Sequence, residues 1–114
     1  MEYKIKSRIW IEAGDKVLMG EGRFHLLQAI EKTGSLSKAA KSLNMSYKKA
    51  WNLMDAVNKS AKEPVLISVI GGKNGGGATL TAYGKLLVES FETINKNCWK
   101  FLDNQLKEHL NNGL

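Results

Sequence analysis

The sequence has 114 residues and a formal net charge of +6, because 17 lysines and arginines face 11 aspartates and glutamates. This length fits one domain, and a hydrophobic content of 43% is typical of a folded globular chain rather than a disordered one. The single cysteine excludes an intrachain disulfide, and no apolar run reaches the roughly 18 residues that suggest a membrane span. We therefore expect one cytoplasmic domain over residues 1–114, with no membrane partner.

The excess positive charge lies in the middle of the sequence. Residues 32–85 contain nine lysines against Asp55 and Glu63, whereas the segments on either side are close to neutral. A basic segment of this kind favours a polyanionic partner such as nucleic acid, but an ordinary solvated surface has the same composition. Charge alone therefore leaves both interpretations open.

The first expected element is a β-hairpin over residues 1–20. Residues 3–12 alternate apolar and charged side chains, which is the two-residue period of a half-buried strand. A turn at 13–15 and a second strand at 16–19 complete the hairpin.

Three helices are expected within residues 22–62. The first has apolar residues at helical spacing and ends at Gly34, a glycine suited to a left-handed C-terminal stop. The second is short and contains Ala39 and Ala40, and Ser46 is the expected N-cap of the third. Small residues in the second helix and a short turn before the third are typical of a helix-turn-helix.

A glycine-rich hairpin and a long helix complete the chain. Residues 65–70 and 78–80 are β-rich and flank a glycine segment, so we expect a wing over residues 64–80. The glycines do not have the spacing of a nucleotide-binding P-loop or of a Rossmann fingerprint. Thr81 is the expected cap of a final helix over residues 82–110, which would be about 43 Å long at 1.5 Å per residue.

The helix-turn-helix pattern favours DNA as the partner of the basic segment over an ordinary solvated surface. The third helix would enter a major groove with its N-terminus first, where lysine can bond guanine, asparagine can bond adenine and tyrosine can contact phosphate or a thymine methyl. The expected contacts from this helix are Tyr47, Lys48, Lys49 and Asn52. The wing tip offers Lys73 and Asn74 to the sugar-phosphate backbone or minor groove, although a tip without a ligand fits the same residues.

An apolar stripe runs along the final helix at spacings of four and three residues. The rest of the domain is large enough to pack against only the first half of this helix. The apolar stripe on the second half therefore favours pairing with a second copy of the chain. A homodimer also suits a helix-turn-helix, because two reading heads then span half-sites about one DNA turn apart. The residues expected to form this dimer are Leu87, Phe91, Ile94, Cys98, Phe101 and Leu102.

Several motifs resemble those of known regulators. Residues 34–43 resemble the first half of a LysR-type winged helix-turn-helix, and the Leu-Thr-x-x-Gly pattern at residues 80–84 resembles the step from the wing into that family's linker helix. Together with Arg-Ile-Trp at residues 8–10, the block at residues 45–51 and the glycine-rich wing, nearly the whole chain resembles the N-terminal DNA-binding domain of ModE-type molybdate-responsive regulators.

This resemblance implies a mainly α fold with small β elements, namely a winged helix-turn-helix with an N-terminal β-hairpin, a glycine-rich wing and a long C-terminal dimerisation helix. It also implies a homodimeric transcriptional regulator that binds double-stranded DNA. The expected DNA-binding residues are Ser35, Ser37, Lys38, Ser46, Tyr47, Lys48, Lys49, Asn52, Lys73 and Asn74. Sequence alone leaves open whether Trp51 faces DNA or the core.

ModE-type regulators that sense molybdate do so through a separate C-terminal domain, whereas this sequence ends just after the expected dimer helix. We therefore expect a chain without that domain and without a cofactor, and a molybdate response has no support. Such a protein can bind DNA constitutively, use a separate effector-sensing partner or bind a ligand at the dimer helices.

Other function classes fit the sequence less well. A non-specific architectural DNA-binding protein shares the charge and the fold, and a winged-helix module for protein interaction or ligand binding shares the fold. His25 and His109 are not part of a spaced cluster of metal-ligating residues in the sequence, so no metal site is expected. The sequence has no nucleophile–base pattern or carboxylate pair typical of an enzyme, and we therefore expect no enzymatic activity.

Overall fold

A computed structural model describes residues 2–69 and 77–111. In chain order these residues form β1 (Ile11–Ala13), β2 (Lys16–Met19), α1 (Glu21–Thr33), α2 (Leu36–Ser42), α3 (Tyr47–Ser60), β3 (Leu66–Val69), β4 (Gly77–Leu80), α4 (Ala82–Leu106) and a short π-helical turn (Lys107–Asn111). The fold is 62% helical, with two small antiparallel hairpins, which confirms the expected mainly α winged helix with a long C-terminal helix. No helix within these residues combines the length and the apolar character needed to span a membrane.

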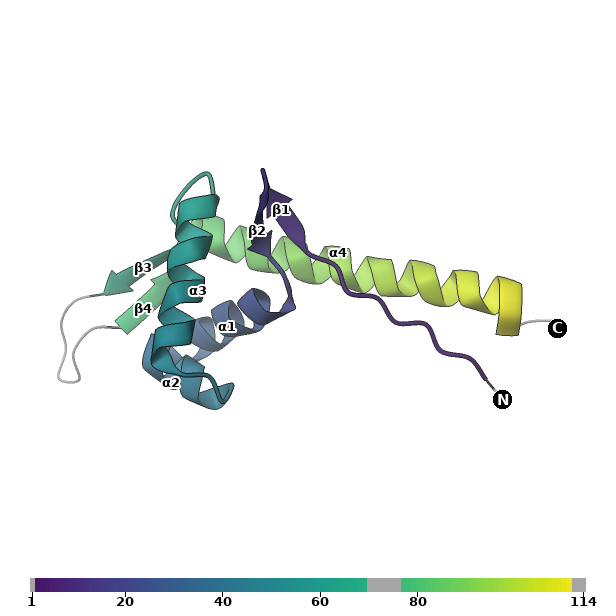
Figure 1. Cartoon of the computed structure of the whole chain (residues 1–114), viewed down its shortest axis with the longest axis horizontal. Helices are drawn as coiled ribbons and strands as arrows, with labels where there is room; N and C mark the ends of the chain where they lie inside the picture. The colour runs from purple at the N-terminus through teal and green to yellow at the C-terminus, as the bar shows by residue number, and fades with distance from the viewer. Residues whose placement is uncertain (1, 70–76, 112–114) are drawn as a thin grey trace.

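The molecule has a head and an arm (Figure 1). The head contains α1, α2, α3, the two hairpins and the first half of α4, and the N-terminal segment runs beside the second half of α4. We call the part of α4 from Ile94 onward the arm. The molecule measures 62 × 29 × 21 Å and its radius of gyration is 17.4 Å. A compact domain of similar length has a radius of gyration near about 13 Å, so the arm accounts for a markedly elongated shape.

The first strand is shorter than the sequence predicted. Pairing begins at Ile11, which lies opposite Met19, and residues 2–10 are extended without belonging to a strand. The predicted alternation is present, because the odd-numbered side chains from residue 5 are half-buried and the even-numbered ones are exposed. However, the surface beneath them is α4: Ser7 Oγ lies 3.7 Å from Cys98 Sγ. An extended chain on a helix buries every second side chain as a strand does, so the period alone could not separate the two.

Local signals place the helix boundaries. Gly34 ends α1 with a φ of 70°, the left-handed conformation that favours glycine. Ser46 caps α3 by accepting a 3.1 Å hydrogen bond from the Lys49 backbone N–H. These findings confirm the expected positions of Gly34 and Ser46. At the C-terminal end, however, the regular α-helix of α4 stops at Leu106 rather than at Leu110.

The start of α4 is joined to the base of the wing. Thr81 caps α4 by accepting from the Gly84 N–H at 3.0 Å, and its hydroxyl donates to the Pro64 carbonyl at 2.6 Å. The Thr81 N–H also donates to the Val65 carbonyl at 3.0 Å. A Cβ at residue 84 would lie 2.1 Å from that same carbonyl oxygen, so only glycine fits there. The Leu-Thr-x-x-Gly pattern therefore has a structural cause.

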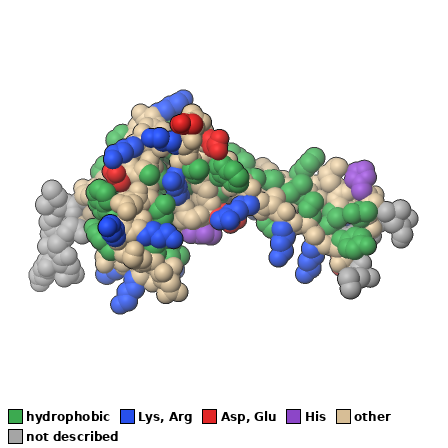
Figure 2. Space-filling model, viewed as in Figure 1, with side chains coloured by type: hydrophobic (Ala, Val, Ile, Leu, Met, Phe, Trp, Pro, Cys, Tyr) green, Lys and Arg blue, Asp and Glu red, His purple; other side chains and the backbone are tan. Residues whose placement is uncertain are grey.

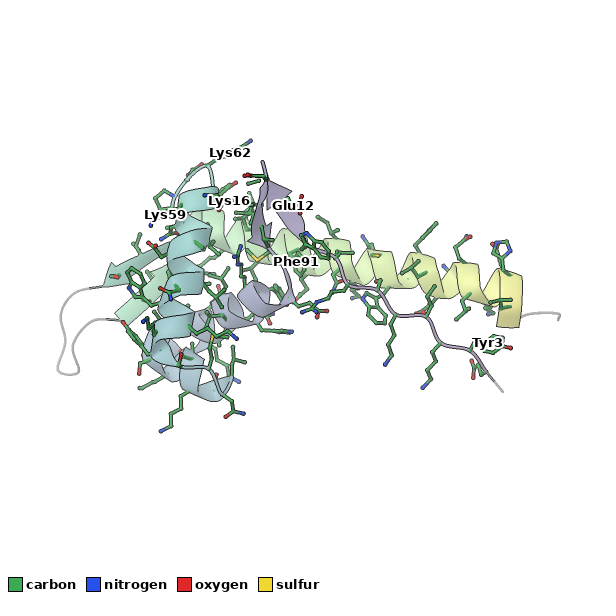
Figure 3. All side chains as sticks on the ribbon, viewed as in Figure 1. Tyr3, Glu12, Lys16, Lys59, Lys62 and Phe91 are labelled. Atoms are coloured by element: carbon green, nitrogen blue, oxygen red, sulfur yellow. The ribbon has the colours of Figure 1, made fainter. Side chains whose placement is uncertain are left out.

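The core lies where α1, α3 and the first half of α4 meet. Its largest fully buried side chains are Met19, Leu26, Leu27, Ile30, Val57, Val65 and Phe91. The Phe91 ring lies 5.3 Å from the Phe24 ring, centroid to centroid, and Figure 3 labels Phe91 at the junction of α4 with the head. Phe91 was expected at the dimer interface, but its 0% exposure places it inside its own chain. The inner half of α4 therefore packs within the monomer.

Candidate nucleic-acid interface

The α2–α3 unit is held by small residues and backbone hydrogen bonds. Ala39, Ala40 and Ala50 are buried where the two helices meet, because a methyl group lets the backbones approach closely. In the turn between the helices, Asn44 adopts a φ of 53°, and the Met45 N–H donates to the Ala40 carbonyl at 2.9 Å. This short, hydrogen-bonded turn fixes the direction of α3 relative to α2.

Helix α3 is divided into a buried face and an exposed face. Ala50, Met54 and Val57 are buried, as their spacing predicted. The side chains that the sequence singled out on this helix are exposed: Tyr47, Lys48, Lys49 and Asn52. Because the helix N-terminus carries the positive end of the helix dipole, its first turn favours an anion. The arrangement thus combines cations, an amide and an aromatic ring on a rigid helix end.

Trp51 lies on the side of α3 that is nearest to the wing, and its ring is exposed to solvent rather than packed in the core. This ring is 50% exposed and lines an open pocket with Tyr47, which is 56% exposed. The pocket lies between α3, the start of α2 and the β3–β4 hairpin, and it is also lined by Ser35, the N-cap of α2, and by Ser37 in the first turn of α2. Trp51 therefore lies at the molecular surface between the third helix and the wing rather than in the core.

Asn58 is a positioning residue that no sequence motif predicted. Its side-chain carbonyl accepts hydrogen bonds from the Val65 N–H at 2.8 Å and the Leu66 N–H at 3.1 Å, and its amide donates to the Leu66 carbonyl at 2.9 Å. These three bonds attach β3 to α3 and so fix the wing's base relative to the third helix. The one available signal was an asparagine beside the apolar stripe near the end of α3.

The supporting helix α2 presents its N-terminus on the same side as the wing. Ser35 is half-buried and caps α2 by accepting from the Lys38 N–H at 3.1 Å, whereas Ser37 and Lys38 are exposed. Lys73 and Asn74, expected on the wing tip, lie outside the described residues. The structure thus brings Ser35 and Ser37 next to the aromatic side of α3, whereas Lys38 does not line this pocket.

Lys and Arg side chains are scattered over the head in the face shown in Figure 2, and fewer Asp and Glu side chains lie among them. One acidic residue, Asp55, lies on the exposed side of α3 and forms an ion pair with Lys59 at 2.8 Å. Among residues 2–69 and 77–111, this is the one ion pair found, so the lysines at the start of α3 are not neutralised in that way. Within the same ranges, no group of three or more acidic, histidine or cysteine side chains is placed to hold a metal.

The arm has its own apolar surface. Ile94 is 49% exposed and Phe101 is 62% exposed, although both are large hydrophobic side chains. Cys98 and Leu102 are half-buried on the arm, and Leu87 is half-buried against the core of the head. Of the six expected dimer residues, the structure therefore leaves Ile94 and Phe101 most available to another molecule.

The fold is that of a winged helix-turn-helix protein. Its capped third helix follows a short turn, a β-hairpin packs beside that helix, and a long helix leads away from the domain. No family model matches the sequence. The chain is 37% identical to the molybdenum transport protein ModE of Azotobacter vinelandii over 92% of its own length and 38% of that protein. It is 35% identical to the DNA-binding transcriptional dual regulator ModE of Escherichia coli K12, over 69% of the chain and 30% of that protein.

A third relative is the molybdenum-pterin-binding protein MopB of Rhodobacter capsulatus, 43% identical over 74% of the chain and 31% of that protein. The chain thus spans between 30% and 38% of the length of these relatives. Together, the fold and the matches identify the chain as a ModE-type winged-helix domain, which corresponds to the N-terminal portion of those longer proteins.

Proposed function

We propose that the protein is a homodimeric transcriptional regulator that reads double-stranded DNA with α3 and the wing. The observation that carries this proposal is the exposed row on α3 that includes Lys48, Trp51 and Asn52, which the packing of the chain itself does not use. Transcriptional regulators among the relatives support the same function. The proposed contacts come from side chains alone and need no cofactor. A cytoplasmic location is part of the proposal, supported by the bacterial transcriptional regulators among the relatives.

The side chains divide between base reading and backbone contact. Lys48 can bond the O6 and N7 acceptors of guanine, and Asn52 can form two hydrogen bonds with adenine. Tyr47 and Trp51 offer apolar edges to thymine methyl groups. Backbone contacts carry no sequence information but fix the register of the protein on the duplex. The residues proposed for backbone contact are Ser35, Ser37, Lys38, Ser46, Lys73 and Asn74.

Replacing Asn52 or Lys48 with alanine should relax base preference at one position of the site by about 1–3 kcal/mol, because one base contact is lost. Selection from random duplexes followed by binding titrations would measure this change. Lys62→Ala, an exposed lysine in the loop after α3, serves as the control and should retain the wild-type preference. If selection with the unaltered protein enriched no motif, specific reading of DNA would be refuted.

The arm is the proposed dimer interface. An exposed Phe101 and an exposed Ile94 on a helix that extends beyond the head present apolar surface that a second arm can cover. Pairing two arms would hold two heads on one duplex, and the half-sites of dimeric helix-turn-helix proteins lie about 34–36 Å apart or a multiple of that distance.

A Phe101→Glu variant should weaken the dimer more than about 100-fold, because an unpaired charge in a buried interface costs about 3–5 kcal/mol. Sedimentation equilibrium over a range of protein concentrations would measure the dissociation constant. Lys100→Glu introduces the same carboxylate at a neighbouring exposed position and should change the constant little. A Phe101→Glu protein that stayed dimeric would show that the arms do not pair through this surface.

A further inference from the structure

Three cations surround the side of α3 that faces away from the wing. Arg8 from the N-terminal segment, Arg23 from α1 and Lys49 from α3 line one open pocket of about 420 Å³. We call these three residues the hairpin flank, because the pocket also reaches the β1–β2 hairpin at Val17. A second surface pocket shares Arg23 and Lys49 and continues along α3. The three cations thus lie beside the N-terminal part of α3, where Lys49 belongs to the first turn of the helix and the two arginines come from outside it.

The hairpin flank has an excess of positive charge. Glu21 is the one acidic side chain among the pocket's lining residues, and within residues 2–69 and 77–111 neither it nor the three cations take part in an ion pair. Arg23 is half-buried and donates a hydrogen bond from Nη1 to the Val17 carbonyl. That bond orients the guanidinium, which has five N–H donors in all. The flank is therefore partly preorganised for an anion.

The walls of this pocket strengthen the field of the cations. Ile9, Val17 and Leu53 line it together with the charged groups, and all three are half-buried. Clefts that combine charge of one sign with apolar walls of low dielectric constant focus the electrostatic potential and attract counter-charges. A flexible, fully solvated lysine cluster would lack this property.

The position of the flank indicates which anion it meets. An α-helix with its side chains is about 10–12 Å wide and a B-DNA major groove is about 12 Å wide, so a helix in the groove lies close to both phosphate backbones. On the wing side of α3, Ser35 and Ser37 lie near one backbone in the proposed complex. On the opposite side of α3, the hairpin flank would face the other backbone.

We propose that Arg8, Arg23 and Lys49 form a second phosphate-binding surface, which holds the DNA strand opposite the one beside the wing. This inference rests on the proposed DNA-reading function and adds the N-terminal segment and α1 to the interface. Two contacts, one on each wall of the groove, fix the rotation of α3 about its own axis. The flank therefore positions the base-reading residues without reading bases itself.

Arg8→Ala is the direct test, because Arg8 is exposed and its loss leaves the core intact. The logarithm of the binding constant falls with the logarithm of salt concentration by about 0.9 for each phosphate contact. The variant should therefore lower the magnitude of this slope by about 0.9 for each bound protomer. Its base preference in the duplex selection should stay unchanged, and Arg8→Lys should restore most of the slope.

Lys4→Ala is the matched control, since it removes one charge from the same extended segment near the end of the arm. Its slope should equal that of the unaltered protein. If Arg8→Ala also leaves the slope unchanged while Lys48→Ala still alters base preference, the hairpin flank does not contact DNA and the proposed function stands. If the unaltered protein binds no duplex at any salt concentration, the proposed function and this inference both fail.

Discussion

Replacing Phe91 with alanine should lower the free energy of unfolding by about 3–5 kcal/mol, the usual cost of truncating a buried phenylalanine. Phe91 has 0% exposure and packs against Phe24, so its removal would leave a cavity between α4 and α1. Small domains are stable by only about 5–15 kcal/mol, and this loss is therefore a large share of the total. Urea unfolding followed by circular dichroism would measure it.

Phe101→Ala provides the comparison on the same helix. Phe101 is 62% exposed, so its truncation opens no cavity within the monomer. Any effect of Phe101→Ala should act through the dimer and so depend on protein concentration, since association stabilises the folded state by mass action. The Phe91→Ala loss should persist at every concentration. Equal, concentration-dependent losses at both positions would place Phe91 at the interface and contradict its burial.

Gly84→Ala should destabilise the protein by at least about 1–3 kcal/mol, the range of typical overpacking changes. The added Cβ would lie 2.1 Å from the Val65 carbonyl oxygen and 3.1 Å from the Val65 carbonyl carbon. These are backbone atoms, and their carbonyl already accepts from the Thr81 N–H, so relief requires α4 to move away from the wing's base. For a domain of this size, each kcal/mol lowers the melting temperature by about 4–8 °C.

Gly22→Ala is the control for helix propensity. Gly22 lies in the first turn of α1, where an added Cβ meets nothing within 4 Å. Alanine there should be neutral or stabilise the protein by up to about 1 kcal/mol, because alanine loses less backbone entropy than glycine in a helix. Thermal unfolding of the two variants side by side would separate the steric effect from the propensity effect. A Gly84→Ala protein as stable as Gly22→Ala would contradict the close contact with Val65.

The end of α1, the start of α3 and the buried face of α3 could be predicted because their causes are local. A serine N-cap at Ser46, a left-handed glycine at Gly34 and the apolar spacing of Ala50, Met54 and Val57 act over one or two turns. The same local pattern placed Lys48 and Asn52 on the exposed face, and both are exposed there. Whether they contact DNA remains a prediction.

Features set by distant contacts could not be predicted in this way. The stripe on α4 has one periodicity, but the head covers Phe91 and ends before Phe101, and only the packed structure shows where that boundary falls. Likewise, the alternation near the N-terminus does not reveal whether a strand or a helix lies beneath it. Arg23 lines the pocket of the hairpin flank and donates to the Val17 carbonyl, a placement that no sequence motif signals.

The contact between the N-terminal segment and α4 joins residues 91 positions apart, Ser7 and Cys98. Cys98 is half-buried there, and it is the single thiol in the sequence. At a protein concentration that keeps the dimer state constant, its rate of reaction with an alkylating reagent therefore reports whether the segment lies on the helix or has detached from it. The same segment carries Arg8. The alkylation rate of the native cysteine can therefore show whether this segment moves when duplex is added, without an engineered label.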